Sequence, residues 1–167
     1  MTKQFWTFLG IGLAVVVVAI VLTLAGTKGS HLELNGNILK VRVLSLNPNA
    51  SIVILDFRAK NPSDLVFVVK NVTIVLEPGS GAAVEGALIS KFDIENVFKY
   101  EKLLGEKYNE VLSIRDKIAP RQTVDRMVGA RFELAEEAIN ARKSIKLRIE
   151  DMDGAVAELG EKQAGSR

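Results

Sequence analysis

An uncharged apolar run near the amino terminus divides this chain into two parts. Phe5 to Ala25 contains 21 residues without a charge, and 17 of them are apolar. A helix of that length rises about 1.5 Å per residue, which matches a hydrocarbon core of roughly 30 Å. We therefore expect residues 5–25 to form a single transmembrane anchor in the lipid bilayer. A short tail, residues 1–4, precedes it, and residues 26–31 form a linker.

Two features of the anchor favour a membrane span over other apolar segments. The valine run makes the segment apolar on every side, which excludes an amphipathic helix packed on a core. An indole near one end suits the headgroup region. The residues that define the anchor are Phe5, Trp6, Val15, Val16, Val17, Val18 and Leu24. The alternative is a cleaved signal peptide, whose apolar region is usually shorter, about 7–15 residues.

The charges that flank the anchor leave its orientation open. Lys3 precedes it, whereas Lys28, Lys40 and Arg42 follow it. The excess on the carboxyl side favours a cytoplasmic domain, but long segments translocate largely regardless of charge. An anchor this close to the amino terminus is typical of a signal anchor. We therefore expect a single-pass protein whose domain lies on the extracytoplasmic side, periplasmic or extracellular.

Residues 32–159 alternate between apolar and polar side chains with period two, which is typical of half-buried strands. Asn-Pro and Pro-Gly turns separate the segments. Seven strands are expected, at 31–46, 51–60, 65–77, 82–90, 123–134, 144–151 and 155–159. An α/β fold would need a helix after nearly every strand. The pattern therefore predicts a mainly β domain, an antiparallel β-sandwich, and a disordered tail at 160–167.

Residues 91–117 break the strand pattern and are expected to form a helical insertion. Ser90 and Asp93 have capping-box spacing, and Ile94, Val97, Phe98 and Leu104 follow as an apolar stripe. A second short helical turn is expected at 108–112, and a short helix at 135–142.

The strand faces give a further set of expectations. In the first strand, Leu39, Val41 and Val43 should be buried, and Lys40 and Arg42 should face water. In the second strand, Val53, Leu55, Phe57 and Ala59 share one face. The runs 52–55 and 65–69 are apolar on both faces. Either the helix at 93–104 covers the outer face, or that face binds a partner.

Composition excludes several kinds of chemistry. There is no cysteine, which excludes disulfides, thiolate metal sites and a cysteine nucleophile, and the net charge of +2 offers nucleic acid no positive face. The one histidine, His31, lies in the linker without a nucleophile motif nearby. We expect a non-catalytic protein with no cofactor and no metal.

Two charged stretches have more ordinary interpretations than binding sites. Glu150, Asp151 and Asp153 lack the spacing of a calcium loop and fit a hairpin turn. A basic stretch could face anionic lipid, but interleaved Asp116 and Asp125 favour a mixed, solvated surface. That stretch contains Arg115, Lys117, Arg121 and Arg126.

The segment Asp56–Asp64, followed by the strand Leu65–Glu77, resembles the late embryogenesis abundant group 2 domain, the water stress and hypersensitive response family. The resemblance covers roughly residues 32–159 and is strongest at Asn61-Pro62. It implies an immunoglobulin- or fibronectin-III-like sandwich behind one membrane anchor, and a role in tolerance of drying and other stress. Asn61 and Pro62 match the family motif with a structural role, and the family implies no catalytic residues.

Together these observations predict a membrane-anchored, non-catalytic envelope protein that protects against desiccation or stress through surface contacts. The alternative is a binding module for a partner protein or a lipid acyl chain at the membrane.

Overall fold

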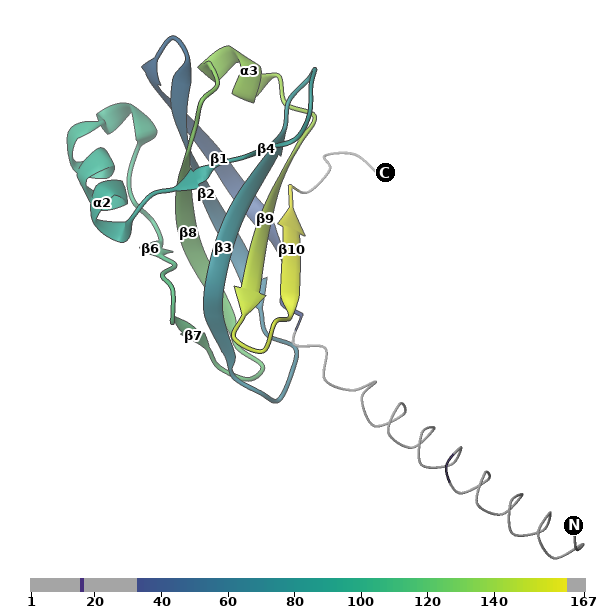
Figure 1. The fold of residues 1–167 in the computed structure, drawn as a ribbon. Helices are drawn as coiled ribbons and strands as arrows, with labels where there is room; N and C mark the ends of the chain where they lie inside the picture. Colours follow the sequence, from purple (N-terminus) through teal and green to yellow (C-terminus); the bar gives the residue numbers. More distant parts are fainter. Residues whose placement is uncertain (1–15, 17–32, 162–167) are drawn as a thin grey trace, which may run out of the picture. The chain divides into compact units, whose positions relative to one another are not determined.

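The computed structural model describes residue 16 and residues 33–161 (Figure 1). The chain divides into two compact units, residues 1–31 and 32–167. Within the predicted anchor only Val16 is described; it has helical backbone and an exposed side chain. His31 and the other anchor residues (Phe5, Trp6, Val15, Val17, Val18 and Leu24) lie outside the described residues. No described helix combines the length and apolar character needed to cross a membrane.

The described part of the second unit is mainly β, with two five-stranded sheets. The first sheet has the order β1-β2-β8-β5, with β6 beside β8, and the second has the order β10-β9-β3-β4, with β7 beside β3. All pairings between these strands are antiparallel except the short parallel contact of β6 with β8, and an isolated bridge between Ile38 and Glu161 is also parallel. The strands are β1 (Asn35–Asn47), β2 (Ala50–Lys60), β3 (Phe67–Glu77), β4 (Val84–Glu85), β5 (Ala87–Leu88), β6 (Glu110–Val111), β7 (Lys117–Ile118), β8 (Thr123–Phe132), β9 (Ser144–Asp151) and β10 (Val156–Gly160). The helical elements are α2 (Lys91–Tyr100), the 3-10 helix η2 (Lys102–Leu104) and α3 (Glu136–Asn140).

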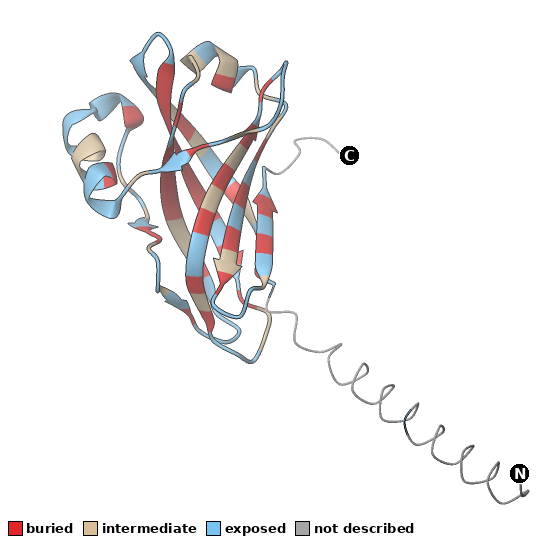
Figure 2. Cartoon of the chain, viewed as in Figure 1, coloured by how far each residue is buried: buried red, intermediate tan, exposed pale blue. Residues whose placement is uncertain are grey.

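The main core lies between the two sheets. The inner face of β2 is fully buried, as its period-two pattern predicts, and it carries Val53, Leu55, Phe57 and Ala59. Ile74 on β3 belongs to the same cluster from the opposite sheet. Burial alternates along β9 and β10, which is visible as bands of colour in Figure 2. The predicted strands at 51–60, 65–77, 123–134, 144–151 and 155–159 are present as β2, β3, β8, β9 and β10.

The face prediction for β1 is wrong at two residues. A bulge between Ile38 and Lys40 shifts the register against β2, so Ile38 is buried and Leu39 is exposed. Val41 and Val43 still pack against the main core, as predicted. Arg42, expected to face water, is buried, because the outer face of β1 lies beneath another part of the chain.

The single strand predicted at 82–90 is instead two short strands that join different sheets. β4 pairs with β3, and β5 pairs with β8, so the chain crosses from one sheet to the other at Gly86. A Cβ at Gly86 would meet Cζ of Phe132 at 2.6 Å and Cβ of Ala130 at 2.8 Å. Only glycine therefore fits this crossing without a shift of its neighbours.

The insertion at 91–117 is helical only in its first half. Ser90 caps α2, because its Oγ accepts the N–H of Asp93, as the capping-box spacing predicts. The helical turn predicted at 108–112 is wrong: β6 lies here, beside β8. Apolar residues spaced three and four apart also fit a short strand with an adjoining loop, so the spacing alone does not separate the two.

The short helix predicted at 135–142 is present as α3. The disordered tail predicted at 160–167 begins too early, because Gly160 belongs to β10 and Glu161 forms a bridge with Ile38. Residues 162–167 lie outside the described residues.

Candidate interaction surface on the insertion

A buried ion pair lies between the first sheet and the insertion. Nη2 of Arg42 on β1 is 2.8 Å from Oδ2 of Asp56 on β2, and each side chain is 4% exposed. Arg42 is opposite Ile54 in the register, so Asp56 is its diagonal neighbour on the same outer face. Charged groups are rarely buried without compensation, so this pair marks a place where the sequence tolerates a substantial desolvation cost.

Hydrogen bonds connect both members of the pair to the insertion. Nη1 of Arg42 donates to the carbonyl oxygens of Leu104, at 3.2 Å, and Glu106, at 2.8 Å. Oδ1 of Asp56 accepts from Nδ2 of Asn109 at 2.8 Å. The pair therefore fixes the chain that leaves η2 against the sheet.

Two aromatic rings complete the surroundings of the guanidinium. Cζ of Arg42 lies 5.1 Å from the ring centre of Phe98 and 5.6 Å from that of Tyr108, within the range of cation–π attraction. Nε and Nη2 of Arg42 and Oδ2 of Asp56 have no hydrogen-bond partner among the described residues. Attraction between charges, rather than aligned hydrogen bonds, therefore holds Nη2 and Oδ2 together.

An apolar cluster, separate from the main core, lies under the insertion. Ile52 and Ile54 on the outer face of β2 pack with Ile94 of α2, Leu104 of η2 and Met127 of β8. The insertion therefore covers the apolar outer face of β2. This is the first of the two alternatives that the sequence left open. Figure 1 shows α2 on the outer side of the first sheet.

The insertion also exposes large apolar side chains. Phe92 and Tyr100 of α2 and Tyr108 are each more than two-thirds exposed, and Leu103 of η2 is 93% exposed. We call these four residues the insertion surface. Scattered exposed apolar residues are ordinary, but four large ones within residues 92–108 make this segment a candidate contact surface.

A shallow hollow of about 430 Å³ borders the insertion surface at Leu103. Its lining comes from β1, η2 and the start of α3, and consists of Val43, Leu44, Ser45, Glu101, Leu103, Leu104 and Glu136. Within residues 33–161, Glu101 and Glu136 have no ion-pair partner. The hollow thus combines an apolar floor with two carboxylates available to a cation.

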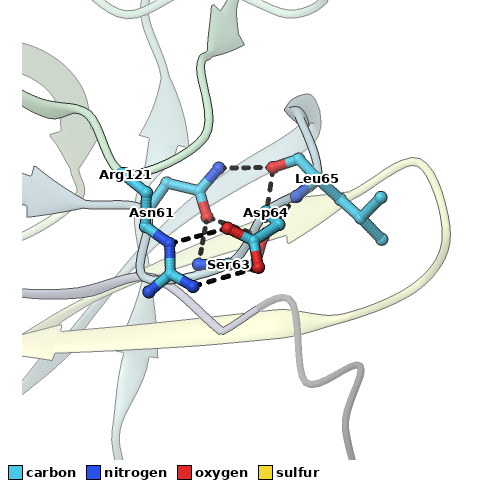
Figure 3. A network of polar contacts seen from close by, with 5 residues as sticks. All are labelled: Asn61, Ser63, Asp64, Leu65 and Arg121. Atoms are coloured by element: carbon cyan, nitrogen blue, oxygen red, sulfur yellow. Dashed lines mark hydrogen bonds and ion pairs between the residues drawn. The ribbon is translucent and has the colours of Figure 1, made fainter.

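Asn61, a residue of the predicted family motif, is buried in a turn between β2 and β3 (Figure 3). Its Nδ2 donates to the carbonyl oxygens of Leu65, at 2.7 Å, and Ile118, at 3.1 Å. Its Oδ1 accepts the backbone N–H of Ser63 at 3.0 Å. These contacts close the turn and tie it to β7, and Pro62, the second motif residue, lies within that turn.

An exposed ion pair lies beside this turn. Nε and Nη2 of Arg121 donate to the two carboxylate oxygens of Asp64, at 2.8 and 3.0 Å. Arg121 holds the pKa of the Asp64 carboxyl below its ordinary value, first through these hydrogen bonds and then through its charge. In the same way, Arg58 lowers the pKa of Asp125.

The acidic turn after β9 has a structural role. Asp151 is buried, its Oδ1 accepts the N–H of Val68 and its Oδ2 accepts that of Asp153. Glu150 pairs with Lys70 instead of joining Asp151. Residue 16 and residues 33–161 contain no group of three His, Asp or Glu side chains placed to hold a metal ion.

Among the described residues, the sequence-predicted motif residues Asn61 and Pro62 lie together where the chain turns into β3. The buried ion pair lies elsewhere, on the outer face of the first sheet. Sequence reasoning missed Arg42 and Asp56. The sequence did contain a signal for this pair. The turn at 47–49 sets the register of β1 against β2, and in that register Arg42 and Asp56 are opposite charges on diagonal positions of one face.

Comparison with known proteins gives no further identification. No family model matches the chain, and no curated protein or solved structure is significantly similar to it. The family resemblance stays a prediction, and functional inference rests on the residues themselves.

Proposed function

We propose that this chain is a membrane-anchored, non-catalytic protein of the late embryogenesis abundant group 2 type. Its domain lies on the extracytoplasmic side and works through surface contacts with proteins. The uncharged run 5–25 supports the anchor, and the Asn61-Pro62 motif with the strand behind it supports the family.

The finer fold in this proposal is an immunoglobulin- or fibronectin-III-like sandwich. The strand order supports it: β1-β2-β8-β5 corresponds to strands A-B-E-D of an immunoglobulin-type domain, and β10-β9-β3 corresponds to G-F-C. In that scheme the insertion falls between strands D and E. An added segment at this position can change contacts without changing the core.

The observation that carries the proposal is the insertion surface. The described core is closed between the sheets, and the outer face of β2 is covered. Large apolar side chains are nevertheless left in solvent on α2, η2 and Tyr108. Aromatic and long apolar side chains that protrude from a firmly held segment are typical of the centres of protein interfaces.

The hollow beside Leu103 defines the chemistry of the partner. Its floor suits one apolar side chain, and Glu101 and Glu136 suit a lysine or arginine next to it. We therefore propose that the partner is a protein segment with apolar and basic residues adjacent. Partly unfolded proteins expose apolar surface that such a site could bind.

A drying experiment with the full chain in phosphatidylcholine vesicles tests this function. The vesicles are dried and rehydrated with a labile soluble enzyme, and the recovered enzyme activity is measured. The test variant carries Phe92→Ser, Tyr100→Ser and Leu103→Ser. The matched control carries Leu39→Ser, Leu46→Ser and Val156→Ser, three exposed apolar positions outside residues 91–117.

The proposal predicts that wild type and control protect the enzyme equally, and that the test variant protects no better than empty vesicles. Equal protection by all three proteins would contradict a role for the insertion surface. Protection no better than that of an unrelated anchored sandwich would contradict the protective function itself.

A further inference from the structure

The chain enters the described domain at a defined end. Asn35, the first residue of β1, pairs with Lys60, the last residue of β2, so the turn from β2 into β3 lies at the same end. We call this the basal end. Eight residues separate Ala25 from Leu34, and a fully extended chain over those nine steps spans at most about 30 Å. The basal end is therefore the part of the domain nearest to the predicted anchor along the chain.

Exposed apolar side chains gather at the basal end. Leu65 and Val66 precede β3, Met152 is in the turn after β9, and Ile114 precedes β7; all four are exposed. Backbone hydrogen bonds show that these loops are neighbours. Met152 N donates to Val68 O at 3.0 Å, and Arg115 N, next to Ile114, donates to Val69 O at 2.7 Å. Figure 1 shows the β2–β3 loop, β7 and the β9–β10 turn together at this end.

Polar contacts hold the basal loops in place. Leu65 O accepts from Asn61, and Leu65 N donates to Ser63 Oγ. Asp151 accepts the N–H of Val68 with one oxygen and that of Asp153 with the other. Leu65, Val66 and Met152 are thus presented by loops whose backbone is already ordered, which lowers the entropic cost of a contact.

The charges at the basal end are nearly balanced. Lys60, Arg115 and Lys117 are exposed there. Arg121 is neutralised by Asp64, and Asp116, Asp153 and Glu33 add negative charge. A balanced apolar surface suits the interface of a zwitterionic bilayer and needs no anionic lipid.

We propose that the basal end rests on the bilayer surface, with Leu65, Val66, Met152 and Ile114 in contact with the lipid interface. This inference rests on the proposed membrane anchor. The chain then contacts the membrane at two places, the anchor and the basal end. The insertion surface, on the side of the first sheet, stays available to protein partners.

The absence of cysteine allows a direct test with single-cysteine variants of the full chain. Leu65→Cys, Met152→Cys and Leu46→Cys are each labelled with an environment-sensitive fluorophore and reconstituted in phosphatidylcholine vesicles. Leu46 is exposed at the far end of β1 and serves as the control. Spin-labelled phosphatidylcholine then quenches any fluorophore that touches lipid.

The inference predicts a blue shift and strong quenching at positions 65 and 152, and neither change at position 46. A fluorophore at Ile114→Cys should also be quenched in the otherwise unchanged chain. That quenching should be lost when Leu65, Val66 and Met152 are all replaced by serine. The insertion-surface serine triple variant should keep it. Equal responses at 65, 152 and 46 would overturn the inference.

Alkaline carbonate extraction separates this result from the anchor. A chain that stays in the membrane but shows no quenching at the basal end would overturn only the basal contact. Release of the chain by carbonate would contradict the anchor and with it the proposed function.

Discussion

Nη2 of Arg42 and Oδ2 of Asp56 lie 2.8 Å apart on neighbouring strands, and the insertion closes over both. Solitary charges at this depth would be strongly unfavourable, so each depends on the other. The pair also orders the backbone carbonyl groups of Leu104 and Glu106. Stability of the sandwich and placement of the insertion surface are therefore linked through one ion pair.

Removing one member of the pair should be costly. We expect Arg42→Ala, and separately Asp56→Ala, to lower the free energy of unfolding by about 3–5 kcal/mol, because each leaves an uncompensated buried charge. Urea unfolding, followed by circular dichroism, measures the change. The double variant Arg42→Ala/Asp56→Ala should be less destabilised than the sum of the single variants, by about 1–3 kcal/mol. Strict additivity would show that the two charges do not interact.

The first sheet should not tolerate a methyl group at Gly129, beneath the insertion. A Cβ at Gly129 would meet Cδ1 of Ile89 at 2.9 Å and Cδ1 of Ile94 at 3.2 Å. We expect Gly129→Ala to destabilise the domain by about 1–3 kcal/mol through overpacking. Hydrogen exchange should show the loss of protection concentrated in α2 and β5. Gly160→Ala offers a comparison without such a contact, since nothing lies within 4 Å of its Cβ position and its backbone conformation suits any residue.

The turn at Asn61 should depend on the amide side chain. We expect Asn61→Ala to cost about 2–3 kcal/mol, because the carbonyl of Ile118 and the N–H of Ser63 lose their partner. Asn61→Asp should be at least as damaging, since a carboxylate cannot donate to Leu65 O. Thermal and urea unfolding measure the stability loss of both variants. Pro62→Ala should cost less than about 1 kcal/mol, because it mainly frees the unfolded chain. A larger effect at Pro62 than at Asn61 would contradict this account of the turn.

The ion pair between Asp64 and Arg121 should give a small, acid-sensitive contribution to stability. The pKa of Asp64 is lower in the folded state, so its contribution is present above the ordinary value of 3.8 and is lost as the pH falls through the folded value. We expect wild type and Asp64→Asn to differ slightly at neutral pH and to converge in acid. High salt should reduce the difference, because the pair is exposed. A difference that grows in acid would contradict the assignment.

Sequence patterns over a few residues correctly predicted the features that depend on neighbouring residues. The inner face of β2, the cap of α2 and the turn at Asn61-Pro62 each depend on residues close in sequence. The burial of Arg42 could not be predicted in this way, because it depends on a bulge at 38–40 and on carbonyl groups more than sixty residues away.

The candidate site was harder to predict than the fold. The stripe that begins at Ile94 predicts which face of α2 is buried, so it indicates that Phe92 and Tyr100 face outward. It does not show that Leu103 and Tyr108 protrude beside them, since η2 and β6 follow from contacts with the first sheet.

Both proposals require the folded domain to be held at the outer face of a membrane, and a sidedness measurement tests this most directly. The full chain with Leu46→Cys is expressed in a bacterial host and treated with a membrane-impermeant maleimide before and after lysis. The account predicts that the chain stays in the membrane fraction and that position 46 is labelled in spheroplasts before lysis. Labelling only after lysis, or a chain found outside the membrane fraction, would contradict it.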